Sequence, residues 1–274
     1  MTDASSDTFT FATEDGLLAY RDTGSGRPVV LLHGGFLDHH MWDDQVPAFT
    51  HDYRVIAPDT RGHGGSANAS RPFRWADDLA ALLRHLDLGP AVLVGVSMGA
   101  TIAVDTALEY PDLVRALVIS GGGTLVPELH EPWAKATADA QYGALAVGDI
   151  QGWTDAFLLW AAGPQREIGE VDPAILGRVR EMAWRTLSKH SVGEVDHLVP
   201  VLDAPARAKE LTVPVLAVNG ALDAPELAGL AEHVARSGAD GRVTVVEGAA
   251  HYPNLEQPEA FNRIVGDFLR TVHA

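Results

Sequence analysis

The amino-acid sequence predicts an α/β fold with a mostly parallel, eight-stranded sheet and helices on both faces. Eight short segments with the composition of strands recur along the chain, and most are separated by segments of helical periodicity. This alternation stops near residue 123 and resumes near residue 210. Residues 91–100 combine an apolar run, a Gly-x-Ser-x-Gly turn and the start of an apolar helix. Strands that alternate with helices form right-handed crossovers, which cover both faces of a parallel sheet.

The first two strands are predicted to form a hairpin. Apolar and polar side chains alternate over Thr8–Ala12, Asp15-Gly16 is a turn signal, and Leu17–Asp22 has the composition of the returning strand. This hairpin would give the sheet an antiparallel edge.

The later strands are rich in valine and leucine, as expected of strands that are buried on both faces. They are predicted at Pro28–Leu32, Tyr53–Ala57, Ala91–Val96, Val114–Ser120, Val213–Asn219 and Arg242–Glu247. The helices show apolar residues three and four positions apart, as do the leucines of Trp75–Leu86. The other helices are predicted at Met41–Phe49, from Ser97 to near Tyr110, at Pro225–Arg236 and at Pro258–Val272.

Residues 124–209 interrupt the alternation. They show helical patterns punctuated by prolines, and no convincing strand. We therefore predict a core formed by residues 1–123 and 210–274, with a helical cap (lid) insertion, residues 124–209, over the carboxyl edge of the sheet.

Composition excludes several classes of protein. The 274 residues carry a formal charge of −17, which argues against binding to nucleic acid or to an anionic membrane. There is no cysteine, and hence no disulfide or thiolate nucleophile. The first seven residues lack a signal-peptide pattern, and no apolar run approaches the ~20 residues of a membrane span. We expect a cytoplasmic protein, either a monomer or a homodimer.

The Gly-x-Ser-x-Gly turn places Ser97 where a strand passes into a helix, which is the position of a nucleophile. A serine hydroxyl needs a histidine base that is oriented by a carboxylate. Among the histidines, His251 comes directly after the last predicted strand. Asp223 is the first carboxylate after the preceding strand, although it could instead cap the next helix. These residues are the predicted catalytic Ser97, His251 and Asp223.

An oxyanion needs two oriented N–H donors. One is predicted to be the backbone N–H of Met98, directly after the nucleophile. The other is expected in the His33-Gly34-Gly35-Phe36 segment, where Gly35 is our first choice because glycine lets a ligand approach closely, and Phe36 is the second.

Five motifs in this order resemble the α/β-hydrolase superfamily. They are His33–Phe36, Asp59–Ser66, Gly95–Gly99, Gly220–Asp223 and His251–Glu259. The resemblance implies the α/β-hydrolase fold, the triad named above and a lid over the pocket. The chain is similar to the branch of small serine esterases, enol-lactonases and cofactor-free haloperoxidases; the residues after His33-Gly34 make the carbon–carbon hydrolases a poorer match.

Aromatic residues are candidates for the substrate pocket. Phe36, Trp133, Phe157 and Trp160 are the predicted substrate-binding residues, and Leu125 and Leu158 are weaker candidates. His39, His40 and His63 have no second ligand cluster at a matching spacing, so we expect no metal site and no organic cofactor.

The sequence thus predicts a serine hydrolase that cleaves a carboxylic ester or lactone of a small, largely apolar substrate through an acyl-enzyme. Two alternatives remain open at this point. One is a signalling protein that binds a small molecule on the same fold with little or no turnover. The other is a tailoring enzyme that uses the same triad for cyclisation or perhydrolysis.

Overall fold

A computed structural model describes residues 8–125, 128–191 and 193–273. The expectation about a signal peptide concerns residues 1–7, which lie outside the described residues. Within the described chain, no helix combines the length and the apolar character needed to cross a membrane.

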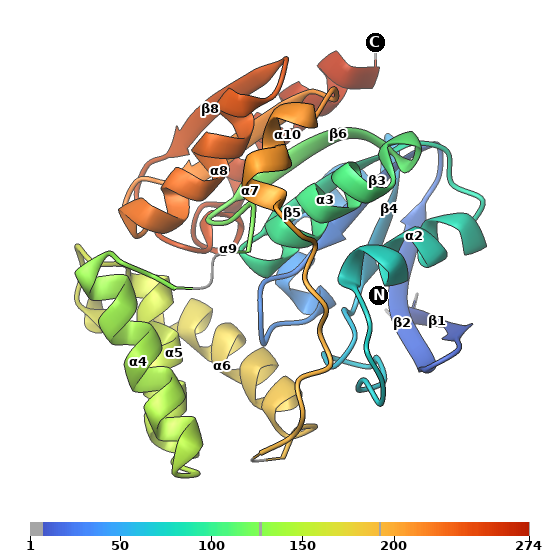
Figure 1. Ribbon diagram of the computed structural model, residues 1–274. Coiled ribbons are helices and arrows are strands. Elements are labelled where there is room, and N and C mark those ends of the chain that lie inside the picture. The colour runs from blue at the N-terminus through green and yellow to red at the C-terminus, as the bar shows by residue number, and fades with distance from the viewer. Residues whose placement is uncertain (1–7, 126–127, 192, 274) are drawn as a thin grey trace, which may run out of the picture.

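The eight strands form one sheet in the order β1-β2-β4-β3-β5-β6-β7-β8, which confirms the predicted mostly parallel sheet (Figure 1). β1 and β2 form the predicted hairpin, β2 also runs antiparallel to β4, and the remaining pairs are parallel. The strands are β1 Thr8–Thr13, β2 Gly16–Gly24, β3 Arg27–Leu32, β4 Tyr53–Pro58, β5 Ala91–Val96, β6 Val114–Ser120, β7 Val215–Gly220 and β8 Gly241–Val246.

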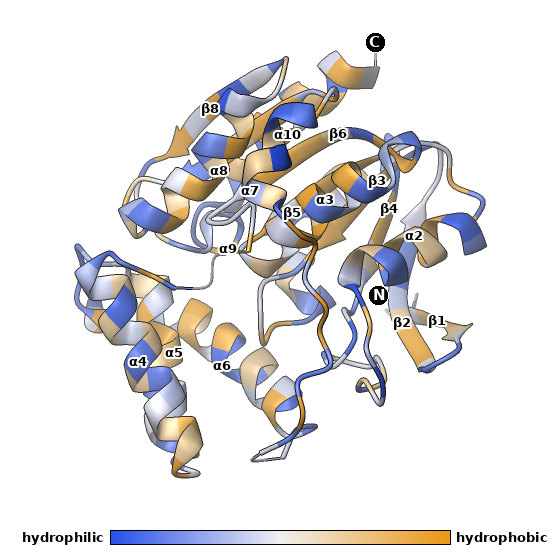
Figure 2. Ribbon diagram, in the orientation of Figure 1, coloured by the Kyte–Doolittle hydropathy of each residue, from blue (hydrophilic) through white to orange (hydrophobic). Residues whose placement is uncertain are grey.

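Helices cover both faces of the sheet. In β5, Leu93 packs into one apolar cluster with α2 (Trp75–His85), α3 (Met98–Glu109) and α8 (Pro225–Ser237). Its neighbours Val92 and Val94 pack into the other cluster with α1 (Val46–Phe49) and α10 (Pro258–His273). Successive side chains point to opposite faces of a strand, and so this run of apolar residues is buried throughout. Figure 2 shows the hydrophobic colour of the central strands of the sheet.

Between β6 and β7 the chain forms α4 (Pro132–Ala146), α5 (Ile150–Ala162) and α6 (Pro173–Leu187), which lie together below the sheet in the view of Figure 1. Glu131, Asp149 and Asp172 accept hydrogen bonds from backbone N–H groups in the first turns of these helices and so fix where they begin. We call this segment the helical insertion. The division of the chain into a core and a cap stays a prediction.

One predicted helix is wrong in its extent. The segment Met41–Phe49 is not continuous: it divides into a 3₁₀ turn, η1 (His39–Trp42), and the short helix α1. The division has a physical reason. Asp38 accepts a hydrogen bond from the N–H of His40 and starts η1 earlier, and Pro47 starts a new helix in its first turn.

Candidate active site

Ser97 occupies a sharp turn between β5 and α3. Its backbone has φ 56° and ψ −117°, a combination that residues with a Cβ rarely adopt. The turn is tight because two glycines let the chain pack closely: a Cβ on Gly95 would lie 2.2 Å from the carbonyl oxygen of Gly99, and a Cβ on Gly99 would lie 2.0 Å from that of Leu32. The sequence therefore holds the serine at the end of a buried strand and at the start of a helix.

His251 and Asp223 meet although 28 residues separate them. Asp223 follows β7, His251 follows β8, and the carboxyl ends of these parallel strands lie at the same edge of the sheet. Both carboxylate oxygens of Asp223 lie 3.1 Å from Nδ1 of His251, and both residues are buried. Asp223 also accepts the N–H of Ala224 at 2.7 Å. The N-cap residue of α8 is Ala224, and no side-chain hydrogen bond caps this helix, so the structure does not bear out the alternative capping role of Asp223.

Two glycines after β6 lie against both His251 and Ser97. A Cβ on Gly121 would lie 2.8 Å from Cε1 of His251, and a Cβ on Gly122 would lie 2.6 Å from the carbonyl oxygen of Ser97. Asn219 accepts the N–H of Gly121 at 3.1 Å and fixes this loop. Sequence reasoning missed this role, although three consecutive glycines after a strand are a signal of close approach.

The loop that carries His251 is anchored by a buried ion pair. Glu256 accepts the N–H of Ala250 at 2.7 Å, and Arg166 of the helical insertion lies 2.6 Å from the other oxygen of Glu256. Burial raises the pKa of Glu256, while the hydrogen bond from Ala250 and the guanidinium of Arg166 oppose that shift. This pair therefore ties the insertion to the histidine loop.

Gly35 and Met98, the predicted oxyanion donors, lie close to one another, and their role as donors stays a prediction. A Cβ on Gly35 would lie 3.9 Å from Cβ of Met98, and both residues line the same cavity. Gly35 belongs to a turn closed by a hydrogen bond of 3.1 Å from the N–H of Leu37 to the carbonyl of Gly34. In this turn Phe36 has a φ of 61°, which is uncommon for a residue with a Cβ. Both choices for the second donor are thus at the cavity.

His33 orients this turn from below the surface. Its Nδ1 lies 2.8 Å from the carbonyl oxygen of Gly34, and its Nε2 accepts the N–H of Thr60 at 3.0 Å. This pattern requires the neutral ring with the proton on Nδ1. Complete burial lowers the pKa of His33, which favours the same neutral form. The ring is therefore a fixed support for the Gly34–Leu37 turn.

Ser97 and His251 line one cavity of about 620 Å³. Its apolar wall is aromatic: Trp153 stacks on Phe157 at 4.9 Å, and Phe36 packs edge-on against Trp153 at 4.7 Å. Trp160 completes the wall, and its ring lies 5.9 Å from that of His251. This volume is in the range of sites for small molecules.

The predicted lining residues do not all reach this cavity. Phe36, Phe157, Trp160 and Leu125 line it, whereas Trp133 and Leu158 are not among the described residues that do. Trp133 instead packs edge-on against Trp160 at 5.3 Å, and so it supports a lining residue.

Polar side chains also line the cavity and were not anticipated; we call them the polar wall, and one of them, Gln141, accepts a hydrogen bond of 3.0 Å from Nε1 of Trp160. Thr101 comes from α3, and the other polar side chains come from α4 or precede it: Glu128, Lys135, Asp139, Gln141 and Tyr142. Lys135 and Asp139 form an ion pair of 2.9 Å. The pattern of α4 alone could not separate residues that face the cavity from those that face solvent, because most of this helix is exposed.

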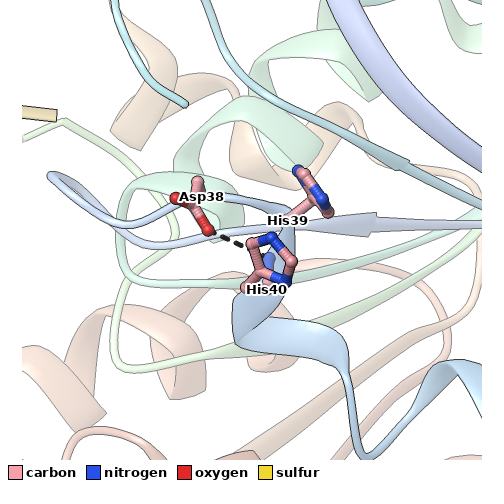
Figure 3. Close-up of side chains that lie close together, drawn as sticks. All are labelled: Asp38, His39 and His40. Carbon is pink, nitrogen blue, oxygen red and sulfur yellow. Dashed lines mark hydrogen bonds between the residues drawn. The ribbon is translucent and has the colours of Figure 1, made fainter. Parts of the chain in front are cut away.

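Asp38, His39 and His40 are the described residues whose grouping could suit a metal ion (Figure 3). Each already has a protein partner. Nε of Arg185 lies 2.8 Å from Asp38, Nδ1 of His39 lies 2.9 Å from Asp59, and Nδ1 of His40 lies 3.1 Å from Asp43. A cation would compete with the guanidinium of Arg185, and so we assign the cluster a structural role. The expectation of no metal site stays a prediction.

Comparison with known proteins finds relatives along nearly the whole chain. It is 30% identical to a pimeloyl-[acyl-carrier protein] methyl ester esterase of Neisseria meningitidis serogroup B, over 89% of this chain and 93% of that protein. It is 26% identical to 3-oxoadipate enol-lactonase 2 of Acinetobacter baylyi, over 93% and 94%.

Among solved structures, the chain resembles a thermophilic esterase from Thermogutta terrifontis with a TM-score of 0.78 and 25% identity. The match covers 98% of this chain and 100% of that one. A family model described as "Alpha/beta hydrolase family" matches residues 29–264. The match spans β3 to α10 and includes every motif on which the resemblance was based. The chain is therefore a member of the alpha/beta hydrolase family.

Proposed function

We propose that the protein is a serine hydrolase that cleaves carboxylic esters or lactones through an acyl-enzyme. One observation carries this proposal: the imidazole of His251, held through Nδ1 by buried Asp223, lines the same cavity as Ser97. Because Nδ1 faces the carboxylate, Nε2 is the nitrogen left to take a proton from a hydroxyl.

The proposed reaction has two halves. Oγ of Ser97 attacks the substrate carbonyl while Nε2 of His251 accepts its proton, and the N–H groups of Met98 and Gly35 stabilise the oxyanion. The tetrahedral intermediate then collapses, the carbon–oxygen bond of the ester breaks, and His251 returns the proton to the leaving alcohol. Water next attacks the acyl-enzyme with His251 as base, which releases the acid and restores Ser97. These steps need neither a metal nor an organic cofactor.

The aromatic wall supports a largely apolar group next to the carbonyl. Phe36, Trp153, Phe157 and Trp160 provide rings that can pack against an alkyl or aryl group. The names of the relatives, a methyl ester esterase and an enol-lactonase, support the same two classes of substrate for this chain.

The substitution Ser97→Ala tests the proposal with a short p-nitrophenyl ester. We expect turnover to fall to the background rate, because the variant lacks the hydroxyl that attacks the carbonyl, while the melting temperature changes by only a few degrees. Ser188→Ala is the matched control: this exposed hydroxyl donates to the nearby carbonyl of Arg185, and its loss should leave turnover unchanged.

Mass spectrometry provides a second measurement. A fluorophosphonate should add to the wild-type protein on the tryptic peptide that contains Ser97, and not to the Ser97→Ala variant. Steady-state turnover that survives in Ser97→Ala would reject the nucleophile. A single stoichiometric burst without continued turnover in the wild type would reject hydrolysis as the function.

A further inference from the structure

A second, much smaller chamber of about 10 Å³ adjoins the main cavity. Trp75, Thr101 and Leu125 line both spaces, and so these side chains lie at the boundary between the chamber and the substrate cavity. Asp105 of α3, the segment Leu198–Val201, Ala76 and Arg74 line the rest of the chamber, and the guanidinium of Arg74 is bound to Asp77 and Glu109. A space of this size holds one water molecule or one group of similar size.

Two residues that line this chamber each have a buried side-chain atom without a partner among the described residues: Oδ1 of Asp105 and Nε1 of Trp75. Asp105 is only 6% exposed, and so bulk solvent has little access to it. Buried polar atoms nearly always have a partner in native proteins. A buried acceptor and a buried donor on residues that line one small chamber make it a suitable place for a polar group, either a water molecule or part of a ligand.

The chemistry of the two atoms narrows the choice of group. The N–H of Trp75 can only donate a hydrogen bond, and so such a group must accept one. Burial, followed by the nearby charge of Glu109, raises the pKa of Asp105 to about 7, and Arg207 and Arg74 partly oppose this shift. The carboxyl group is thus partly protonated near neutral pH, when it can accept or donate. A hydroxyl group, which does both, satisfies both atoms.

The position of Asp105 relates the chamber to the proposed reaction. Ser97, Thr101 and Asp105 are spaced four residues apart and lie along one face of α3. Eight residues of helix place Asp105 about 12 Å along the axis from Ser97. Thr101 lies midway and borders both spaces. A flexible chain that starts at the carbonyl carbon and follows α3 would end at the chamber.

We propose that Asp105 and Trp75 form a distal subsite that binds a hydroxyl group at the far end of the substrate. The inference rests on the proposed function and deepens it, since it specifies an ester or lactone product with a polar group well separated from the carbonyl. In the free protein a water molecule would take the same place.

The test is a series of p-nitrophenyl ω-hydroxyalkanoates of increasing length, each paired with the alkanoate of the same length. At one chain length the hydroxyl should raise kcat/KM roughly tenfold, the value of one additional hydrogen bond. We compare the ratio of kcat/KM for the hydroxyalkanoate to kcat/KM for the alkanoate of the same length. At shorter lengths, where the hydroxyl cannot reach the chamber, this ratio should be near or below one.

Variants of Asp105 and Trp75 show which side chains cause the preference for the hydroxyl group. Asp105→Leu should bring the ratio at the preferred length to about one, while kcat/KM for the plain alkanoates changes little. Trp75→Phe should lower the ratio several-fold, and because Trp75 also lines the main cavity, only the ratio is interpreted for this variant. Asp105→Asn retains an acceptor and a donor and should retain most of the preference. Thermal melting of each variant excludes a folding defect. A ratio near one at every length, or a preference that survives Asp105→Leu, overturns the proposal and leaves the chamber as a site for water only.

Binding measurements test the distal subsite independently of the proposed hydrolytic function. α,ω-Alkanediols and alkanols of matched length can be titrated by calorimetry into the wild type and the Asp105→Leu variant without any turnover. Tighter binding of the diol by the wild type, lost in the variant, supports the subsite even if no ester is hydrolysed. Loss of ester turnover alone would count against the serine mechanism only.

Discussion

At the scale of single residues, the hydrogen bonds of Asp223 bear on the tautomer of the His251 imidazole. It holds Nδ1 of His251 with both oxygens and accepts the N–H of Ala224. In Asp223→Asn the amide keeps the size but can no longer present two acceptors, so the imidazole would favour the wrong tautomer. We expect kcat for a p-nitrophenyl ester to fall on the order of 10³–10⁴-fold, with KM changed little.

Steady-state kinetics and a thermal melt check this expectation together. The control is Asp203→Asn, an exposed aspartate with a left-handed backbone that asparagine tolerates well, and it should leave kcat unchanged. A loss of less than tenfold in Asp223→Asn would show that the carboxylate does not orient the base.

Asp105 leads to a prediction about stability and pH. Its pKa of about 7 in the folded protein lies above the ordinary 3.8. Between these values the folded state keeps a proton that the unfolded chain has lost, so its contribution to stability is complete below pH 3.8 and is lost as the pH rises to about 7. The variant Asp105→Leu has no carboxyl group at this position and so does not lose this stability as the pH rises. The unfolding free energy of the variant minus that of the wild type should therefore be about 2 kcal/mol more positive at pH 8 than at pH 5.

Urea unfolding of both proteins at the two pH values measures this difference, and titrations common to both proteins cancel in the comparison. Glu109, Arg74 and Arg207 are the charged groups that act on Asp105, and they are retained in the variant. An equal gain at both pH values would mean that Asp105 is already ionised in the folded protein at pH 5.

The sequence predicted the residues whose position is marked by a strand end. Ser97, Asp223 and His251 each follow a predicted strand, and the rule that parallel strands end at one edge was sufficient to group them. Asp105 and Trp75 could not be found this way. Their importance lies in an absent hydrogen-bond partner, which depends on packing between α2, α3 and the segment near Leu198.

At the scale of secondary-structure elements, the close contact of α3 with the ends of β3 and β5 can be tested by alanine substitutions at two glycines. A Cβ on Gly99 would lie 2.0 Å from the carbonyl oxygen of Leu32, so Gly99→Ala should force α3 away from the sheet. We expect a loss of about 1–3 kcal/mol in unfolding free energy, together with a large loss of turnover, because α3 carries Ser97 at its N-terminus.

The matched control is Gly229→Ala in α8, where an added Cβ would meet no atom within 4 Å. Alanine is favoured over glycine in a helix, so this variant should gain about 0.5–1 kcal/mol and keep full activity. Denaturant unfolding and ester turnover compare the two variants directly. Equal effects at both positions would contradict the tight packing at the serine turn.

Elements were predictable where burial dictates the pattern. All eight strands were found within two residues of their bounds. Apolar side chains on both faces mark the central strands such as β5, and alternation with a turn signal marks the β1–β2 hairpin. The helical insertion was recognised as helical, but its lining residues were not separated from its supporting ones. Which of Trp133 and Trp160 faces the cavity depends on how α4 packs on α5.

At the scale of the whole molecule, the strong negative charge bears on the choice of substrate. The chain carries a formal charge of −17. Three acidic or basic side chains from α4 or the residues before it are among the described residues that line the main cavity: Glu128, Lys135 and Asp139. Lys135 is already paired with Asp139 at 2.9 Å, which leaves the carboxylate of Glu128 as the excess charge. A cavity of this kind repels an anionic substrate.

We therefore predict that an ester with a terminal carboxylate reacts more slowly than its neutral isostere. The kcat/KM of mono-p-nitrophenyl succinate should be about tenfold below that of p-nitrophenyl 4-methylpentanoate, whose isopropyl group has the shape of the carboxylate, at low ionic strength. The gap should narrow as salt screens the charges. Glu128→Gln should narrow it further, whereas Glu232→Gln, which removes a carboxylate paired with Arg236 on α8, should not. Faster reaction of the succinate would mean that Lys135 leaves Asp139 to bind the substrate's carboxylate, and the polar wall would then select anions.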